Sequence, residues 1–106
     1  MSECIVVFVT VSSRREAKKV IAAVIKAKLV ACVNVVPGIE STYWWQGKVE
    51  KAKEFLLIMK TKRTLFKKLV VCVKNNHSYT VPEIIALPIT AGNPDYLKWI
   101  EENTNR

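Results

Sequence analysis

The chain lacks most of the features that mark a secreted, membrane or disordered protein. No apolar run approaches the length of a membrane span, and no N-terminal stretch has the pattern of a secretory signal. Low-complexity runs are also absent, so residues 103–106 are the one segment expected to be disordered. The three cysteines, Cys4, Cys32 and Cys72, are odd in number and include no CxxC pair. They predict a reduced, cytosolic protein whose thiols are small buried side chains.

Catalytic signatures are missing as well. The chain has no nucleophile elbow, no Walker loop, no HExxH motif and no paired-carboxylate arrangement. It has a single histidine, His77, and no nucleophile placed beside a base. The sequence therefore predicts a protein that is not an enzyme and that requires no cofactor.

Acidic residues are few. Nine Asp and Glu stand against seventeen Lys and Arg, for a formal charge of +8, which would suit an anionic partner. The basic residues are spread over every segment, however, so a solvated surface is the favoured interpretation. RRM domains have the order β-α-β-β-α-β, which we also expect for this chain, but their aromatic RNA-binding signature is absent from the sequence. We expect neither a nucleic-acid partner nor a membrane partner.

What the chain does hold is an alternation of strand-like and helix-like segments, with half of its residues apolar. Apolar, β-branched runs predict strands at 5–9, 31–45, 55–61 and 84–89, with helices between them and a short helix at the end. The order β-α-β-β-α-β is that of the ferredoxin-like split βαβ fold, an α+β class with a four-stranded antiparallel sheet. We expect one such domain over residues 1–106.

Local signals predict how several elements begin and turn. Ser13 followed by Glu16 matches a capping box, and Asn93 before a proline marks the start of the last helix. Thr61 or Thr64 is the expected cap of the second helix. The run 31–61 predicts a long hairpin with a turn at 46–48, a bend or bulge at 37–38 and a tip that projects beyond the sheet.

In the strands at 5–9, 55–59 and 84–89, both the odd-numbered and the even-numbered positions are apolar, so both faces of the sheet are expected to be apolar. Two helices cover only one face of a sheet, and a soluble monomer rarely leaves a large apolar patch exposed. We therefore expect other copies of the chain to cover the second face, with a small apolar ligand as the alternative. The aromatic run 43–45 near the hairpin tip fits an interface.

Three polar residues stand out against these apolar runs. His77 is either a metal or proton site with Glu83 nearby, or a loop histidine bonded locally, which is the favoured interpretation. Glu83 lies next to a buried strand, where an unpaired carboxylate is costly, and Lys60 is its expected partner. A Lys60–Glu83 pair would be either structural or the polar centre of a ligand pocket, and the sequence leaves both open.

Several stretches, in fixed order over essentially the whole chain, resemble the CutA family of divalent-cation tolerance proteins. These stretches are residues 31–34 and Pro37, Ser41, Tyr43, Trp45, Gly47 and Lys48, Lys60-Thr61, residues 77–89, and Gly92, Tyr96, Leu97 and Trp99-Ile100. The resemblance implies a ferredoxin-like fold, a homotrimer packed through its sheets and an architecture shared with PII-type signal proteins. It also implies a role in tolerance to copper and other divalent cations, with no enzymatic reaction.

Carried over by position, the resemblance implies two sets of site residues. The metal ligands would be His77, Glu83 and Cys32, and an inter-subunit ligand pocket would be lined by Tyr43, Trp45, Lys60, Tyr79 and Glu83.

This chain departs from the family pattern in two places. Ser78 stands where the family usually has proline, which loosens the loop. Val9 and Asn76 stand where some members carry a cysteine and a second histidine. What remains is a weaker His–carboxylate site, assisted by Cys32 or a neighbouring subunit.

We expect a cytoplasmic homotrimer that is involved in the response to metal ions and binds copper. The alternative is a trimer that uses no metal and acts as a scaffold or a small-ligand signalling protein. A third hypothesis, charge-driven binding of anions or nucleic acid, would show affinity that falls steeply with salt.

Overall fold

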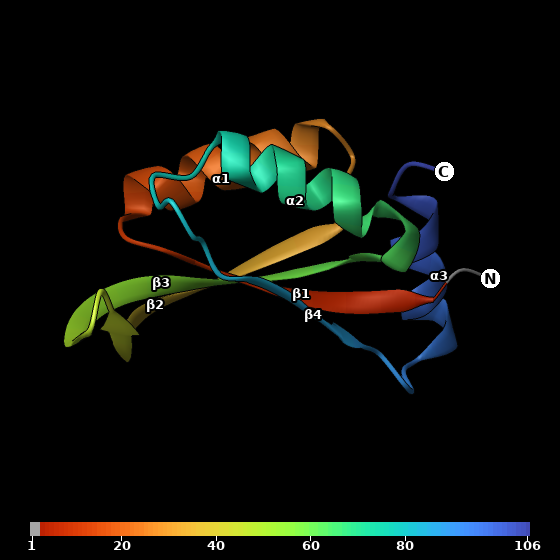
Figure 1. Ribbon diagram of the computed structural model, residues 1–106. Helices are drawn as coiled ribbons and strands as arrows, with labels where there is room; N and C mark the ends of the chain where they lie inside the picture. The colour runs from red at the N-terminus through yellow and green to blue at the C-terminus, as the bar shows by residue number, and fades with distance from the viewer. Residues whose placement is uncertain (1–2) are drawn as a thin grey trace.

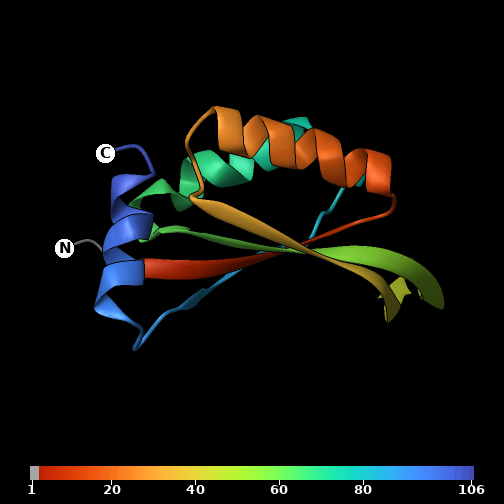
Figure 2. The same cartoon turned by 180° about the vertical axis from the view of Figure 1, so that it is seen from behind.

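The structure, a computed structural model, describes residues 3–106, so residues 1 and 2 of the expected domain lie outside the described part. Its elements are β1 (Cys4–Val11), α1 (Arg14–Lys26), β2 (Cys32–Trp45), β3 (Lys48–Lys62), a 3-10 turn η1 (Arg63–Leu65), α2 (Phe66–Asn75), β4 (Ile84–Pro88) and α3 (Pro94–Glu102). The strands form one antiparallel sheet in the order β2-β3-β1-β4. Figures 1 and 2 show α1 and α2 over the same face of this sheet. The predicted ferredoxin-like fold is confirmed.

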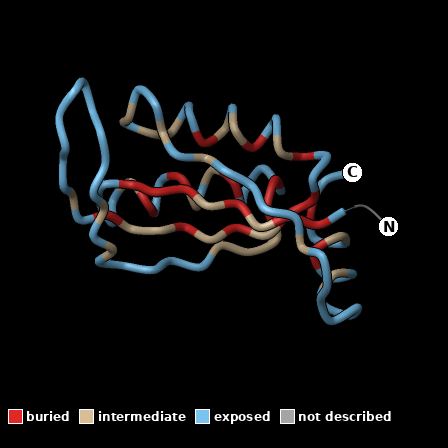
Figure 3. The backbone as a smooth tube through the Cα atoms, turned by 60° about the horizontal axis from the view of Figure 1, so that its bottom comes forward, coloured by how far each residue is buried: buried red, intermediate tan, exposed pale blue. Residues whose placement is uncertain are grey.

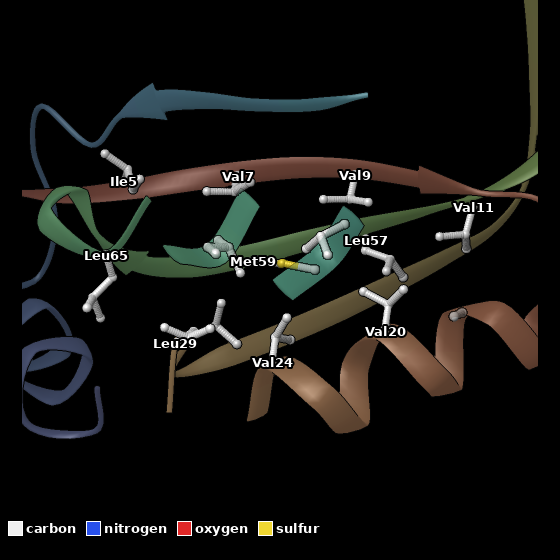
Figure 4. Packing of buried hydrophobic residues seen from close by; sticks show 14 residues of the cluster. Ile5, Val7, Val9, Val11, Val20, Val24, Leu29, Leu57, Met59 and Leu65 are labelled. Atoms are coloured by element: carbon white, nitrogen blue, oxygen red, sulfur yellow. The ribbon is translucent and has the colours of Figure 1, made fainter. Parts of the chain in front are cut away.

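The hydrophobic core lies between the two helices and the sheet. Val7 and Val9 of β1 point toward α1, whose Val20 and Val24 meet them together with Met59 of β3 (Figure 4). All five side chains are fully buried. Burying a side chain of this size contributes roughly 1.5–3 kcal/mol relative to leaving it exposed. The apolar residues that recur at every second position of the strands thus pack in one core with those that recur at helical spacing in α1.

The face of the sheet turned away from α1 and α2 is apolar too. The register places Phe8 between Ile58 and Ile85 on this face, with Leu87 and Val36 on neighbouring rungs. Ile85 is 50% exposed and Leu87 is 45% exposed, and β4 is largely pale blue in Figure 3. These five residues are named the open face below. The prediction that the strands are apolar on both sides is confirmed.

The β2–β3 hairpin continues past the end of β1 as a two-stranded ribbon. Val11, the last residue of β1, pairs with Phe55, whereas β2 and β3 stay paired out to Trp45 and Lys48. Figures 1 and 2 show this ribbon reaching beyond the sheet and curling at its tip. The projecting hairpin is therefore as predicted.

Two irregular points shape the hairpin. The register shifts between residues 36 and 39, and Gly38 has a φ of 70° there, which glycine adopts without strain. At the tip, Gln46 and Gly47 have φ values of 50° and 77°. Two residues with positive φ make the kind of turn whose twist matches that of the flanking strands. The predicted bulge and tip turn are both confirmed.

Two of the predicted helix starts are confirmed. The Ser13 hydroxyl accepts a hydrogen bond from the Glu16 backbone N–H at 3.1 Å, and the Asn93 side chain accepts one from the Asp95 N–H at 3.1 Å. The return bond of the capping box is replaced, because the Glu16 carboxylate accepts from the Ser78 N–H instead. Glu16 thus ties the start of α1 to the loop after α2.

The predicted cap of the second helix is wrong. The 3-10 turn precedes α2, Leu65 occupies the N-cap position, and no side chain caps either element. Thr61 is fully buried in β3, and its hydroxyl donates to the Leu29 carbonyl at 2.6 Å. Thr64 lies exposed within the 3-10 turn. The Thr61 hydroxyl is therefore used in a buried hydrogen bond of β3 and is not available to cap α2.

The expected disorder of residues 103–106 is also corrected. Thr104 is buried, and its hydroxyl donates to the Ile100 carbonyl at 3.0 Å. The backbone N–H of Asn105 donates to the Lys28 carbonyl at 3.0 Å, and its side chain donates to the Ala27 carbonyl at 2.7 Å. These bonds fasten the segment after α3 to the end of α1. Among the described residues, no helix is long and apolar enough to cross a membrane.

Candidate ligand cleft and predicted metal residues

His77 lies at the start of the loop between α2 and β4, and its side chain is fully buried. Its Nε2 bonds the Thr10 carbonyl at 2.7 Å, and the Tyr79 backbone N–H bonds its Nδ1 at 3.1 Å. A carbonyl only accepts and an amide N–H only donates, so the ring is neutral with its proton on Nε2. Both nitrogens are engaged, as the locally bonded alternative expects.

Glu16 stands beside this ring and was not among the predicted site residues. Its Oε2 accepts from the Ser78 N–H at 3.1 Å, and its Oε1 lies 3.6 Å from His77 Nδ1. Within the described part of the chain, Oε1 is buried and accepts no hydrogen bond. The sequence pattern at Glu16 indicates a capping box, and only the folded chain brings α1 beside this loop.

Cys32 and Lys60 lie at the other end of the sheet, side by side on β2 and β3. The Lys60 ammonium donates to the Asn34 side chain and lies 4.0 Å from Cys32 Sγ. Tyr96 of α3 is a further neighbour of Cys32. Burial, followed by the charge of Cys32 and a hydrogen bond with it, raises the pKa of Tyr96. The surroundings of Cys32 are thus Lys60, Asn34 and Tyr96, not His77 or Glu83.

The predicted Lys60–Glu83 pair does not form within the chain. Val6 of β1 pairs with Lys60 on one side and with Leu87 on the other. Lys60 is therefore level with Leu87, four residues from Glu83, or about 13 Å along a strand. Antiparallel register, which the sequence alone did not supply, separates the two charges.

The structure does not bring the three predicted metal ligands together in one chain. His77 is held against β1, Glu83 is exposed at the start of β4, and Cys32 lies near the far end of the sheet. Across residues 3–106, no group of three or more His, Cys, Asp or Glu side chains is placed to hold a metal ion.

Four of the five predicted pocket residues do meet. Tyr43, Trp45, Tyr79 and Glu83 line a cleft of about 820 Å³ between the projecting ribbon and the loop after α2. This space is named the hairpin cleft. The fifth, Lys60, is not among its lining residues. The cleft exists because β2 and β3 outrun β1, so the ribbon and residues 78–83 face one another across the end of the sheet.

A buried carboxylate forms part of the cleft wall. Glu54 is only 5% exposed, and its Oε2 accepts a hydrogen bond from the Tyr79 hydroxyl at 2.8 Å. Burial, followed by this bond and by the Glu54 charge, raises the pKa of Tyr79 well above its ordinary value. The phenol therefore stays protonated and keeps donating. Glu54 was not predicted, although it directly precedes an apolar strand run, the same signal that singled out Glu83.

Comparison with known proteins gives a consistent result. A family model described as "CutA1 divalent ion tolerance protein" matches residues 5–103. "Protein CutA 1, chloroplastic" of Oryza sativa is 53% identical over 100 residues, covering 94% of this chain and 56% of the relative. The "Divalent-cation tolerance protein CutA" of Thermus thermophilus is 50% identical over 99 residues, covering 93% of this chain and 96% of the relative. The chain thus spans about half of the plant relative but nearly all of the bacterial one.

Solved structures agree with the sequence matches. The crystal structure of CutA1 from Oryza sativa superposes with a TM-score of 0.95 at 51% identity, covering 98% of this chain and 95% of that one. The CutA1 structure from Thermus thermophilus gives a TM-score of 0.93 at 50% identity, covering 99% and 100%. Since the family model covers nearly the whole chain, this protein belongs to the CutA1 divalent ion tolerance protein family.

Proposed function

We propose that the chain is a homotrimeric divalent-cation tolerance protein without enzymatic activity, which acts in the response to metal ions. The observation that carries the proposal is the family match over residues 5–103. The Thermus thermophilus relative, half identical over nearly its full length, is named for the same role. Copper is the ion proposed for direct binding. Architecture shared with PII-type proteins remains a prediction.

The open face supports self-association. Phe8, Ile58 and Ile85 form one apolar rung across three strands, and Ile85 and Leu87 stay about half exposed in the single chain. Packing sheet against sheet buries this surface and leaves α1 and α2 in solvent. The proposed trimer therefore removes an apolar patch that a lone chain would expose. A cytoplasmic location stays a prediction, because one relative is named chloroplastic and one similar structure is named periplasmic.

Metal binding, in this proposal, requires ligands from more than one subunit. His77 has both nitrogens engaged within its own chain. Glu83 is exposed at the rim of the hairpin cleft, and Cys32 is half-buried near the opposite end of the sheet. A carboxylate and a thiol supplied by different subunits would suit copper better than a hard cation such as Mg²⁺.

The test is a calorimetric titration of copper(II), with zinc(II) alongside, into protein stripped with chelator. Glu83→Gln removes the proposed carboxylate ligand, and Glu102→Gln on α3 makes the same charge change outside the cleft. We expect saturable binding at a fixed ratio per trimer that Glu83→Gln weakens at least tenfold and Glu102→Gln leaves unchanged. Binding that exceeds any fixed ratio and ignores both variants would show surface chelation only.

A second candidate function is a scaffold or small-ligand signalling trimer that uses no metal. It is favoured by one observation: the histidine most suited to a metal serves as a buried loop anchor, whereas the hairpin cleft is open.

A further inference from the structure

The charge of the hairpin cleft is opposite to that of the chain. The chain has a formal charge of +8, from seventeen basic and nine acidic residues. Among the described residues, the charged side chains that line the cleft are Glu54 and Glu83, and no Lys or Arg lines it. A cation entering this space therefore meets carboxylates, although the chain as a whole carries a net positive charge.

Glu54 is placed to bind rather than only to support the fold. Its side chain lies in the wall of the cleft and is only 5% exposed, so its charge is poorly screened. The Tyr79 hydroxyl occupies Oε2, and no described residue donates to Oε1. A buried carboxylate with one partnered oxygen is stabilised further by an N–H donor on a ligand.

The remaining lining suits an organic cation better than a bare metal ion. Tyr43 and Trp45, which project from the same face of β2, are each 42% exposed and border the cleft together with Tyr79. The faces of such rings attract ammonium and guanidinium groups and also contact the carbon skeleton attached to them. The cleft volume of about 820 Å³ fits a molecule far larger than a metal ion.

We infer that the hairpin cleft binds a small organic cation, a primary ammonium carried on an aromatic or aliphatic body. The ammonium donates to Glu54 Oε1 and to Glu83 at the rim, and the body lies against the aromatic side chains of Tyr43 and Trp45. This site differs from the proposed metal site in its ligand, an organic cation, and in its use of the buried Glu54 carboxylate. The two sites share Glu83. The organic-cation site gives a ligand class to the second candidate function.

The experiment titrates the full chain with 2-phenylethylammonium and follows tryptophan fluorescence and heat. The matched neutral probe is 2-phenylethanol, and the matched anion is 3-phenylpropionate. All titrations contain chelator, so the result does not depend on whether the protein binds copper. We expect saturable binding of the ammonium and at least tenfold weaker binding of the other two probes.

Three variants test the residues. Glu54→Gln keeps an acceptor for the Tyr79 hydroxyl but removes the buried charge. Glu83→Gln removes the exposed charge at the rim, where folding is not at risk. Glu102→Gln makes the same change of charge on α3. We expect roughly tenfold weaker ammonium binding in each of the first two and no change in the third.

Equal affinity for the ammonium and the alcohol would overturn the inference, because the cleft would then be a merely apolar surface. Absence of binding by all three probes would overturn it too. An equal loss in Glu83→Gln and Glu102→Gln would mean that net charge, not the cleft, attracts the cation. Copper binding with no ammonium binding would leave the metal proposal standing and this one rejected.

Discussion

At the scale of single residues, His77 and Tyr79 show how buried hydrogen bonds assign a role that residue type cannot. The neutral His77 ring fastens the loop to β1 through the Thr10 carbonyl. Its Nδ1 accepts from the Tyr79 backbone N–H, and the hydroxyl of the same residue donates to Glu54. A lone histidine suggests metal or proton chemistry, yet here it positions one wall of a cleft.

The Tyr79–Glu54 bond leads to a prediction about alkaline pH. Because the pKa of Tyr79 is raised above 10.0 in the folded chain, the unfolded chain loses this proton first as pH rises. The contribution to stability is complete below pH 10 and is lost progressively above it. We expect the free energy of unfolding of Tyr79→Phe to fall less steeply with pH than that of the parent, by urea unfolding between about pH 8 and 11.

The parent and Tyr79→Phe should also differ near neutral pH. There the variant should be less stable by about 1–3 kcal/mol, since the buried Glu54 oxygen loses its donor. Tyr96 also has a raised pKa, so part of the alkaline loss persists in the variant. Identical slopes for the two proteins would contradict the assignment.

At the scale of elements, α1 and α2 differ in the interactions that set where each helix begins. Ser13 caps α1 through its own hydroxyl, whereas α2 grows out of a 3-10 turn without any side-chain cap. The chain reaches α2 directly from the buried end of β3, so core packing sets its start. Local capping signals therefore identify helices that follow a loop, but not one that continues from a strand.

Paired alanine substitutions test this difference. We expect Ser13→Ala to lower the free energy of unfolding by about 1 kcal/mol, because the Glu16 N–H loses its acceptor. Thr64→Ala, at the position predicted as a cap, should change stability by less than about 0.5 kcal/mol. Chemical unfolding monitored by circular dichroism measures both. A loss in Thr64→Ala equal to that in Ser13→Ala would restore the predicted cap.

At the scale of the whole molecule, the sheet is apolar on both faces while α1 and α2 cover one. The projecting ribbon and the open face lie outside the core that these helices close (Figures 1 and 4). In the single chain, the apolar side chains on one face of the sheet are therefore buried by helices, whereas those on the other face are exposed to solvent. This exposed apolar surface is the physical basis of the proposed trimer.

A charge placed on the open face should separate the subunits without unfolding them. Ile85→Lys puts an ammonium at a position that is 50% exposed in the single chain but buried in the proposed assembly. We expect monomers at micromolar concentration by size-exclusion chromatography with light scattering, with circular dichroism unchanged. The control is Val71→Lys on α2, a residue 59% exposed on the helical side, which should remain assembled. The same mass for both variants would reject the open face as the interface.

The sequence by itself determined the order of elements, the long hairpin with its bulge and tip turn, two helix caps and the family. These depend on local backbone preferences and on the period of apolar residues, which neighbouring positions in the chain encode. It also named four residues that meet in the hairpin cleft, through resemblance to the family.

Only the tertiary structure decided which polar groups meet. Strand register placed Lys60 beside Asn34 and level with Leu87, so the expected pair with Glu83 was wrong. Packing of α1 against the loop after α2 brought Glu16 to His77, and β3 carried Glu54 to Tyr79. Such contacts join residues tens of positions apart, and a shift of strand register by one residue would turn Lys60 and Glu54 to the opposite face of the sheet. Local sequence patterns do not encode that alignment, whereas the closed core fixes it.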